Sequence, residues 1–146
     1  MNPPNLQKFK TWRVCKSAEE TVAAARELAS ALPPDCTLAL FGGLGAGKTT
    51  FVRGLAETFG VRENVTSPSY NIYAIYDGRE RQLIHMDAYR LPSPEAAENL
   101  MLEEFMRSPW CWVVEWPEKI GDALPPDAIK IDFEITADGA HRFRVR

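Results

Sequence analysis

The residues with the clearest chemistry form a run of small side chains, a lysine and two threonines, GGLGAGKTT, at positions 42–50. Residues 42–49 fit the phosphate-binding pattern G-x-x-x-x-G-K-[ST] without a mismatch, between an apolar stretch and a helical pattern. Glycines let successive backbone N–H groups turn toward a phosphate chain that side chains would keep away. The run therefore predicts a loop that holds the phosphates of a nucleotide.

Each residue type in this loop has a separate expected role. Lys48 supplies a point charge near the β- and γ-phosphates, and the Thr49 hydroxyl is a ligand for octahedral Mg²⁺. The helix that begins near Gly47 directs its positive end toward the same phosphates. No N/T-K-x-D segment exists to read guanine, so we expect ATP with Mg²⁺. The expected nucleotide contacts of the loop are Gly42, Gly45, Ala46, Gly47, Lys48 and Thr49.

A magnesium–nucleotide site also needs a carboxylate at the end of a neighbouring strand. The apolar run CWVVE ends in Glu115, which we expect to bind the metal, with a surface acid at a strand end as the alternative. The run LIHMD ends in Asp87, which we expect to make a second polar contact with the metal or its waters. His85 shares the face of Asp87 because strand side chains alternate, and it is more simply a structural histidine.

Other side chains are candidates for completing the site. The segment VTSPS at 65–69 lies where many P-loop switch proteins sense the γ-phosphate, although any turn before a strand offers similar hydroxyls. Trp116 follows the acid directly; it is a core residue by default, but it could instead shape the site or contact a partner. The candidates for γ-phosphate sensing are Thr66, Ser67 and Ser69, and those for shaping the site or meeting a partner are Trp116, Tyr89 and Arg90.

The last six residues, HRFRVR, place three arginines on one face of the final predicted strand, Arg142, Arg144 and Arg146. A solvated edge strand guarded by charge is the simpler interpretation. A surface for an acidic or RNA-bearing partner is the alternative, and the sequence does not decide between the two.

The elements that must position these residues alternate between strand and helix in the first half of the chain and become hairpins later. The predicted single P-loop domain spans 1–146, with an N-terminal extension at 1–16, a first helix at 17–32, the strand and phosphate loop at 38–49, a hairpin at 70–89, the acid-bearing strand at 111–116 and a C-terminal hairpin at 128–146. A further amphipathic helix is expected over 93–107, with a serine cap and a proline at its first position. This order predicts a three-layer α/β P-loop NTPase sheet, parallel at its centre with antiparallel hairpin additions.

Composition narrows the classes of function. The 146 residues are 45% hydrophobic and 25% charged, which is typical of a globular domain. The net charge of −3 argues against direct binding of RNA or DNA, which usually needs a basic surplus. Three cysteines without CxxC spacing are expected to be reduced core thiols. No apolar run reaches the roughly 20 residues of a membrane span, and the first residues lack a secretory pattern, so we expect a cytoplasmic protein without membrane contact.

Four separated motifs then coincide. GGLGAGKTTF, VTSPSYNIY, HMDAYRL and VVEWPEK follow one another in the order and approximate spacing of the bacterial TsaE (YjeE) family, and the chain resembles that family over about residues 17–136. The resemblance implies the small ATPase of tRNA threonylcarbamoyladenosine biosynthesis, which modifies the adenosine beside the anticodon. It implies two paralogous partners, TsaB and TsaD, whose complex the ATPase binds and resets by hydrolysis, so that tRNA is contacted only indirectly.

The resemblance also implies residue roles. Lys48, Thr49 and Thr50 would carry the nucleotide contacts, Glu115 the second protein contact to Mg²⁺, and Asp87 would be the acid of an Asp-x-Tyr-Arg motif. Lys48, Asp87 and Glu115 are therefore the expected catalytic set. NLMLEEF lacks the glycine that the family often has after the acidic helix start. Two single positions also depart from the family pattern, since Gly43 stands where an aspartate is common and Ser69 where a threonine is usual. Neither departure removes an expected metal ligand.

Two other functions fit parts of the pattern. HMDAYR resembles the Asp-x-Phe-Tyr stretch of uridine-kinase-like enzymes, but only some 30 residues follow position 116, too few for a lid and a substrate domain. A nucleotide-dependent binding module that never hydrolyses is the second alternative. P-loop proteins are often slow until a partner completes the site, so we expect weak ATPase activity alone that rises in a partner complex.

Overall fold

The structure, a computed structural model, describes residues 4–68 and 71–146, and within them seven strands form one mixed sheet in the order β1-β7-β6-β2-β5-β4-β3. Strands β6, β2, β5 and β4 run parallel. At one edge β3 pairs antiparallel with β4, and at the other β7 pairs antiparallel with β6 and β1 antiparallel with β7. In chain order the strands are β1 (Arg13–Cys15), β2 (Cys36–Phe41), β3 (Tyr73–Asp77), β4 (Gln82–Asp87), β5 (Trp110–Glu115), β6 (Ile129–Ile135) and β7 (His141–Val145).

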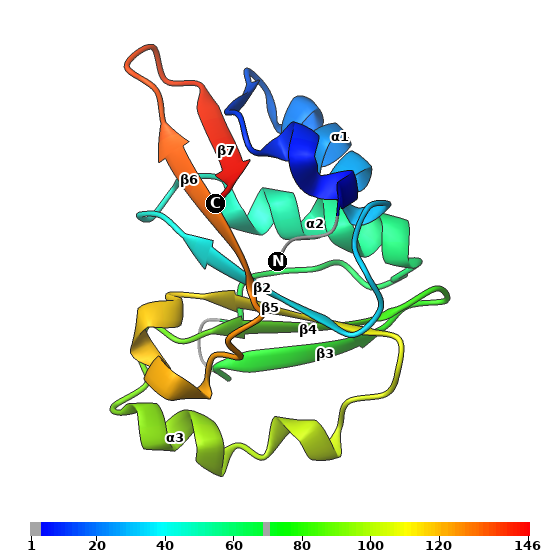
Figure 1. The fold of residues 1–146 in the computed structure, drawn as a ribbon, viewed down its shortest axis with the longest axis vertical. Helices are drawn as coiled ribbons and strands as arrows, with labels where there is room; N and C mark the ends of the chain where they lie inside the picture. The colour runs from blue at the N-terminus through cyan, green and yellow to red at the C-terminus, as the bar shows by residue number, and fades with distance from the viewer. Residues whose placement is uncertain (1–3, 69–70) are drawn as a thin grey trace.

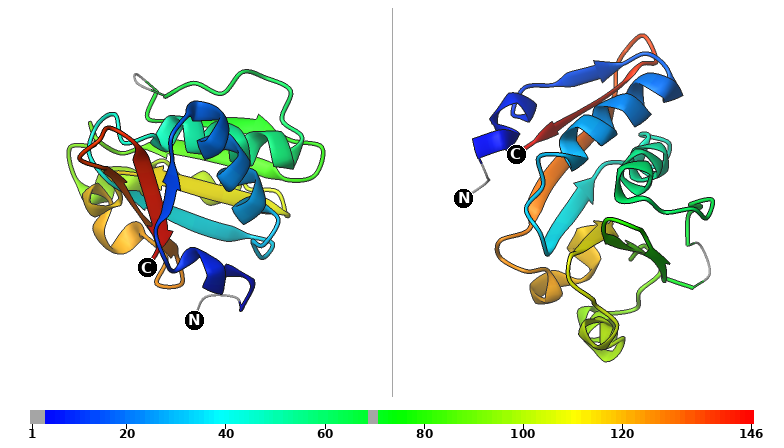
Figure 2. Two further views of the ribbon diagram at one scale, coloured as in Figure 1. Left: turned by 90° about the horizontal axis from the view of Figure 1, so that it is seen from above. Right: turned by 90° about the vertical axis from the view of Figure 1, so that its right-hand side faces the viewer.

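Helices cover both faces of this sheet and give three layers (Figure 1). α1 (Ala18–Ala29) and α2 (Lys48–Phe59) lie on one face and α3 (Pro94–Asn99) lies on the other, as Figure 2 also shows. The predicted α/β sheet, parallel at its centre with antiparallel hairpins, is confirmed. The described residues also contain short 3-10 helices, η1 (Pro4–Phe9), η2 (Leu102–Glu104), η3 (Pro117–Lys119) and η4 (Gly121–Ala123).

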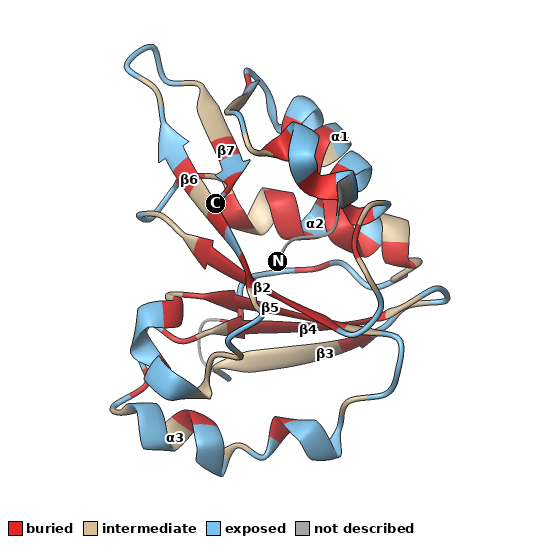
Figure 3. Ribbon diagram, viewed as in Figure 1, coloured by how far each residue is buried: buried red, intermediate tan, exposed pale blue. Residues whose placement is uncertain are grey.

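The sheet divides the core into two clusters, and the central strands are buried along most of their length (Figure 3). On the face of α1 and α2, the Phe51 ring packs against Phe133 and Phe143, with ring centroids 5.1 and 5.0 Å apart. On the face of α3, Ile84 and Trp112 belong to the second cluster. Apolar layers on both faces fix the central strands, and the loops at their carboxyl ends therefore start from rigid positions.

The two helices on the first face are defined by local rules. Ser17 caps α1, because its Oγ accepts a hydrogen bond from the Glu20 N–H at 3.1 Å, and the Glu20 carboxylate accepts one from the Lys16 N–H at 3.1 Å. α1 crosses α2 at Gly54, where a Cβ atom would lie 2.6 Å from the Ala25 Cβ. The absence of a side chain at Gly54 therefore lets the two helices approach closely.

The expected long helix over 93–107 is wrong. Ser93 and Pro94 do start a helix, but α3 ends at Asn99, and Met101 adopts a left-handed backbone with φ 53°. Helical structure resumes only as the short 3-10 helix η2, and Gln82 of β4 holds the residues after it, since its side chain accepts from the Arg107 N–H at 2.9 Å and donates to the carbonyl at position 105 at 3.0 Å. These bonds attach the end of the segment to the sheet in a non-helical conformation.

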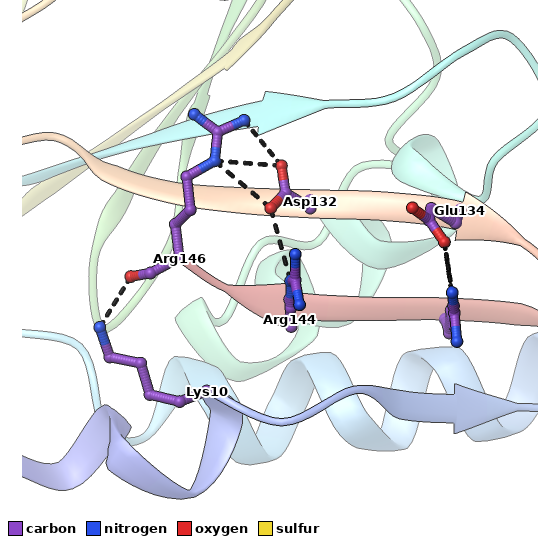
Figure 4. A network of polar contacts seen from close by, with 6 residues as sticks. Lys10, Asp132, Glu134, Arg144 and Arg146 are labelled. Atoms are coloured by element: carbon purple, nitrogen blue, oxygen red, sulfur yellow. Dashed lines mark hydrogen bonds and ion pairs between the residues drawn. The ribbon is translucent and has the colours of Figure 1, made fainter.

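The last strand is not a sheet edge, so the edge-strand interpretation of the three arginines is wrong. β1, from the predicted N-terminal extension, pairs antiparallel with β7 and takes the edge position. The arginine side chains instead pair with acids of β6 (Figure 4). Arg142 donates to Glu134 at 2.6 Å and Arg146 to Asp132 at 2.8 Å, while Arg144 lies 3.7 Å from Asp132. The basic charge of the strand is therefore partly neutralised within the protein.

All three cysteines are buried with free thiols. Cys36 and Cys111 face each other on adjacent parallel strands, with their Sγ atoms 3.9 Å apart. Burial raises the pKa of the Cys111 thiol, which favours its neutral form. Within the described ranges, no helix has both the length and the apolar character that crossing a membrane requires.

The crossing of α1 and α2 gives a stability prediction. Gly54→Ala places a methyl group 2.6 Å from the Ala25 Cβ and 2.7 Å from the Val22 carbonyl, and overpacking should outweigh the gain in helix propensity. We expect the free energy of unfolding in urea to fall by about 1–3 kcal/mol. The control is Gly43→Ala, since a Cβ there meets no atom within 4 Å, and it should change stability by less than about 0.5 kcal/mol. Equal effects of the two variants would contradict the packing argument.

Candidate functional site

The site begins at the carboxyl end of β2, where residues 42–47 turn into α2. Gly45 and Gly47 have positive φ angles of 77° and 96°, which side chains rarely tolerate, and Gly47 is the N-cap of α2. This backbone conformation lies at a helix N-terminus, and the glycines place no side chains of their own over its N–H groups. The loop can therefore surround an anion, as the sequence pattern predicts.

Lys48 is the first residue of α2 and is buried, with only 5% of its surface exposed. Its Nζ donates a hydrogen bond to the Gly42 carbonyl at 2.7 Å and lies 3.9 Å from Glu115 Oε1. The ammonium group also lies 4.8 Å from the ring centroid of Trp116. These contacts fix the lysine charge beside the loop and aim it toward the end of β5.

Glu115 ends β5, the parallel neighbour of β2, and its carboxylate is almost completely buried. Its Oε2 atom lies 2.5 Å from Nε2 of His85, which is fully buried on β4. An ionised carboxylate can only accept hydrogen bonds, so with Glu115 ionised the donor of this bond is Nε2 of His85. The carboxylate thus lies between an ammonium and an imidazole, the kind of partners that a buried charge requires.

Asp87 lies opposite Glu115 in the ladder between β4 and β5. One of its carboxylate oxygens accepts a hydrogen bond from the Tyr89 N–H at 3.0 Å, which fixes the side chain at the start of the following loop. The carboxyl ends of β2, β5 and β4 therefore bring the lysine and both acids to one edge of the sheet. The expected catalytic residues lie together.

These groups line a cleft of about 290 Å³. Two of the predicted loop contacts are set back from it: the Gly42 carbonyl binds the lysine, and Ala46 is buried. The residues lining the cleft are Leu44, Gly45, Gly47, Lys48, Thr49, Thr50, Ser67, Asp87, Glu115, Trp116 and His141.

The remaining candidates lie beside this cleft. Thr66 lines a separate pocket with Ser67, while Ser69 falls outside the described residues. Tyr89 and Arg90 line an adjoining cavity of about 390 Å³, which shares Trp116 with the cleft. The Tyr89 and Trp116 rings contact each other with centroids 5.0 Å apart, and Tyr89 is half exposed. Trp116 therefore separates the cleft from the adjoining cavity, and Tyr89 packs against it from the side of the cavity.

Two side chains of the site were not assigned a role from the sequence. Leu44, at the exposed tip of the phosphate loop, and His141, at the start of β7, both line the cleft. No motif marks His141, and only the order of strands brings it near the loop. The contact between His85 and Glu115 could have been inferred, because both occupy the same face of adjacent strands.

The donor set suits a hard cation. The Thr49 hydroxyl and the carboxylates of Asp87 and Glu115 line the same cleft, and oxygen ligands are those that Mg²⁺ prefers. Within the described ranges, no group of three or more His, Cys, Asp and Glu side chains could hold a metal ion by itself. Mg²⁺ in nucleotide sites is usually held by one or two protein ligands together with phosphates and water, so the residues present fit this ion.

Comparison with known proteins shows the family to which this chain is related. Residues 15–143 match the sequence model of the family described as threonylcarbamoyl adenosine biosynthesis protein TsaE. The chain belongs to the TsaE family. This confirms the resemblance seen in the four motifs and extends it to the last strand. TsaE proteins take part in tRNA threonylcarbamoyladenosine biosynthesis, and their P-loop is a nucleotide-binding element.

Individual relatives agree with the family match. The tRNA threonylcarbamoyladenosine biosynthesis protein TsaE of Treponema pallidum is 36% identical over 132 residues, covering 90% of this chain and 97% of the relative. The protein of the same name from Bacillus subtilis is 37% identical over 127 residues, covering 87% and 78%. A crystal structure of Bacillus subtilis YdiB is similar with a TM-score of 0.75 and 34% identity, covering 92% of this chain and 83% of that one.

The structure of the chain after β5 is relevant to the alternative that the protein is a small-molecule kinase. Residues 117–119 and 121–123 form η3 and η4, and β6 and β7 then join the sheet. The segment that a kinase would use for a lid and a second substrate is here part of the sheet and its connections. The fold therefore offers no support for the kinase interpretation.

The position of Lys48 gives a binding prediction. Lys48→Ala removes the buried positive charge of the phosphate loop and should cost about 2–4 kcal/mol of nucleotide binding, roughly 30- to 1000-fold in Kd. Isothermal titration calorimetry with MgADP and MgATP measures the change. Lys130→Ala, at an exposed position on β6, is the matched control and should leave the Kd unchanged. Retention of wild-type affinity in Lys48→Ala would rule out the loop as the phosphate site.

Proposed function

We propose that this protein is an Mg²⁺-dependent, ATP-binding and slowly ATP-hydrolysing subunit required for the threonylcarbamoyladenosine modification of tRNA. It acts by binding a threonylcarbamoyl-transfer complex of TsaB- and TsaD-like proteins in the cytoplasm and resetting that complex between turnovers. The observation that carries the proposal is the convergence of the phosphate loop, Lys48, Glu115 and Asp87 on one cleft. The tRNA is contacted only through the partners.

The loop and its lysine hold the nucleotide in this proposal. Backbone N–H groups around Gly45 and Gly47 surround the phosphates, the ammonium group of Lys48 neutralises charge near the terminal ones, and Thr50 adds a contact. Thr49 and Glu115 hold Mg²⁺. When bound, this ion neutralises the charge that develops on the transferring phosphoryl group.

The acids orient the nucleophile. Glu115 and Asp87 lie at the strand ends that face the loop, where a carboxylate can position an attacking water or the waters of the metal. His85 fixes the orientation of the Glu115 carboxylate through the hydrogen bond of 2.5 Å. The hydroxyls of Thr66, Ser67 and Ser69 are the proposed sensors of the γ-phosphate.

The positions of the arginines near the site support slow ATP hydrolysis by the isolated protein. Arg53 donates to the Val65 carbonyl at 3.0 Å and is thereby held by the backbone, while Arg90 lines the adjoining cavity. Catalysis of phosphoryl transfer depends on positioning and on charge stabilisation, to which an arginine placed by a partner can contribute several orders of magnitude. We therefore propose that the partner complex completes the site, with Trp116, Tyr89 and Arg90 at its mouth.

The role proposed for Glu115 predicts different effects of its substitution on nucleotide binding and on ATP hydrolysis. Glu115→Gln keeps the size of the side chain and an oxygen that can accept from His85, but it removes the negative charge that anchors the metal. We expect MgADP affinity to change by less than about 5-fold and ATP turnover to fall by at least about 100-fold, measured by calorimetry and phosphate release. Glu118→Ala, an exposed acid three residues later, should retain turnover. Normal hydrolysis by Glu115→Gln would refute the assignment of the metal ligand.

Reconstitution tests the function as a whole. ATP hydrolysis and tRNA threonylcarbamoylation should be measured with TsaB- and TsaD-like proteins, with and without this subunit. We expect multiple-turnover tRNA modification only when the subunit and ATP are both present, and a rise in ATPase rate of at least about 10-fold in the complex. Identical modification without the subunit would contradict the proposed role. An ATPase rate stimulated by a nucleoside instead of by partners would revive the kinase alternative.

A further inference from the structure

The order of strands assigns a direction to a nucleotide in the cleft, if the proposed function holds. Glu115 and Asp87, the expected partners of Mg²⁺ and the terminal phosphate, lie on β5 and β4, on one side of the phosphate loop of β2. Strands β6, β7 and β1 lie on the other side. A phosphate chain whose terminal end faces the acids therefore extends its nucleoside end toward β7.

His141 is the side chain that β7 places at this end. β6 runs parallel to β2, so its last residue, Ile135, lies at the same edge of the sheet as the phosphate loop. His141 pairs with Ile135 at the start of β7. It also shares the face of Phe143, whose ring packs against Phe51 of α2 with centroids 5.0 Å apart. The imidazole is thereby directed toward the N-terminal end of α2.

The imidazole lies directly against the phosphate loop. A Cβ atom built on Gly47 would lie 3.3 Å from His141 Nδ1, so the ring faces bare backbone at the N-cap of α2. His141 lines the same cleft as Thr49 and Thr50. Its imidazole donates no hydrogen bond to another described residue, and an imidazole N–H is a suitable donor to a phosphate or hydroxyl oxygen.

We infer that His141 binds the segment of the nucleotide where the α-phosphate joins the ribose, and so positions the nucleoside end of ATP over β7. It is a binding residue and takes no part in bond breaking, since the acids lie on the opposite side of the loop. The inference rests on the proposed function, because it requires a nucleotide in this cleft. It adds a contact from the C-terminal hairpin, an element with no phosphate-binding motif.

A comparison of two ligands tests this inference. MgADP carries the α-phosphate and ribose, whereas magnesium pyrophosphate offers only the groups expected near Lys48 and the acids. Titration calorimetry with His141→Ala should show MgADP binding weakened about 5- to 20-fold and pyrophosphate binding changed by less than about 2-fold. His141→Gln retains an N–H donor and should recover MgADP binding to within about 3-fold of wild type.

The matched control is Arg142→Ala, the next residue along β7, which points to the opposite face of the sheet and should bind both ligands like wild type. Unchanged MgADP affinity in His141→Ala, with normal binding by wild type, would overturn this inference and leave the proposed function intact. Equal weakening of both ligands would also overturn it, because His141 would then act only by supporting the loop. Absence of MgADP binding by wild type would overturn the proposed function and this inference together.

Discussion

The buried carboxylate of Glu115 is the interaction on which the rest of the site depends. A carboxylate on a side chain that is only 7% exposed is stable only with partners, and the structure supplies the Lys48 ammonium from α2 and the His85 imidazole from β4. The three side chains come from three separate elements, which the parallel arrangement of β2, β5 and β4 brings to one edge. The same edge carries the glycine loop, so one electrostatic cluster joins the phosphate cradle to the acids.

Much of this arrangement could be predicted because short sequence patterns determine it. The phosphate loop needs glycines at fixed positions, a buried parallel strand needs an apolar run, and a helix start needs a cap such as Ser17. Each requirement is met by residues close together in sequence. Strand order, by contrast, depends on contacts between distant segments, and no short pattern encodes it.

The features that the sequence did not predict depend on such contacts between distant segments. The segment after Ser93 has a helical pattern, but hydrogen bonds to Gln82 of β4 hold its end in another conformation. The sequence indicates that the last strand lies at the edge of the sheet, because nothing in the short run RVC predicts that β1 pairs with it. His141 lacks a motif and reaches the cleft only through the position of β7. Tertiary contacts decided all three cases, where local propensity could not.

The pairing of β1 with β7 limits how far the N-terminus of this domain can be shortened. The family match begins at residue 15, so a fragment trimmed to it would lose Arg13 and Val14, most of the covering strand. Residues 142 and 143 of β7, which pair with these two residues, would then present unpaired backbone N–H and C=O groups at the edge of the sheet, where strands of other molecules can pair. β1 thus covers part of this edge of β7, although none of its residues lines the cleft.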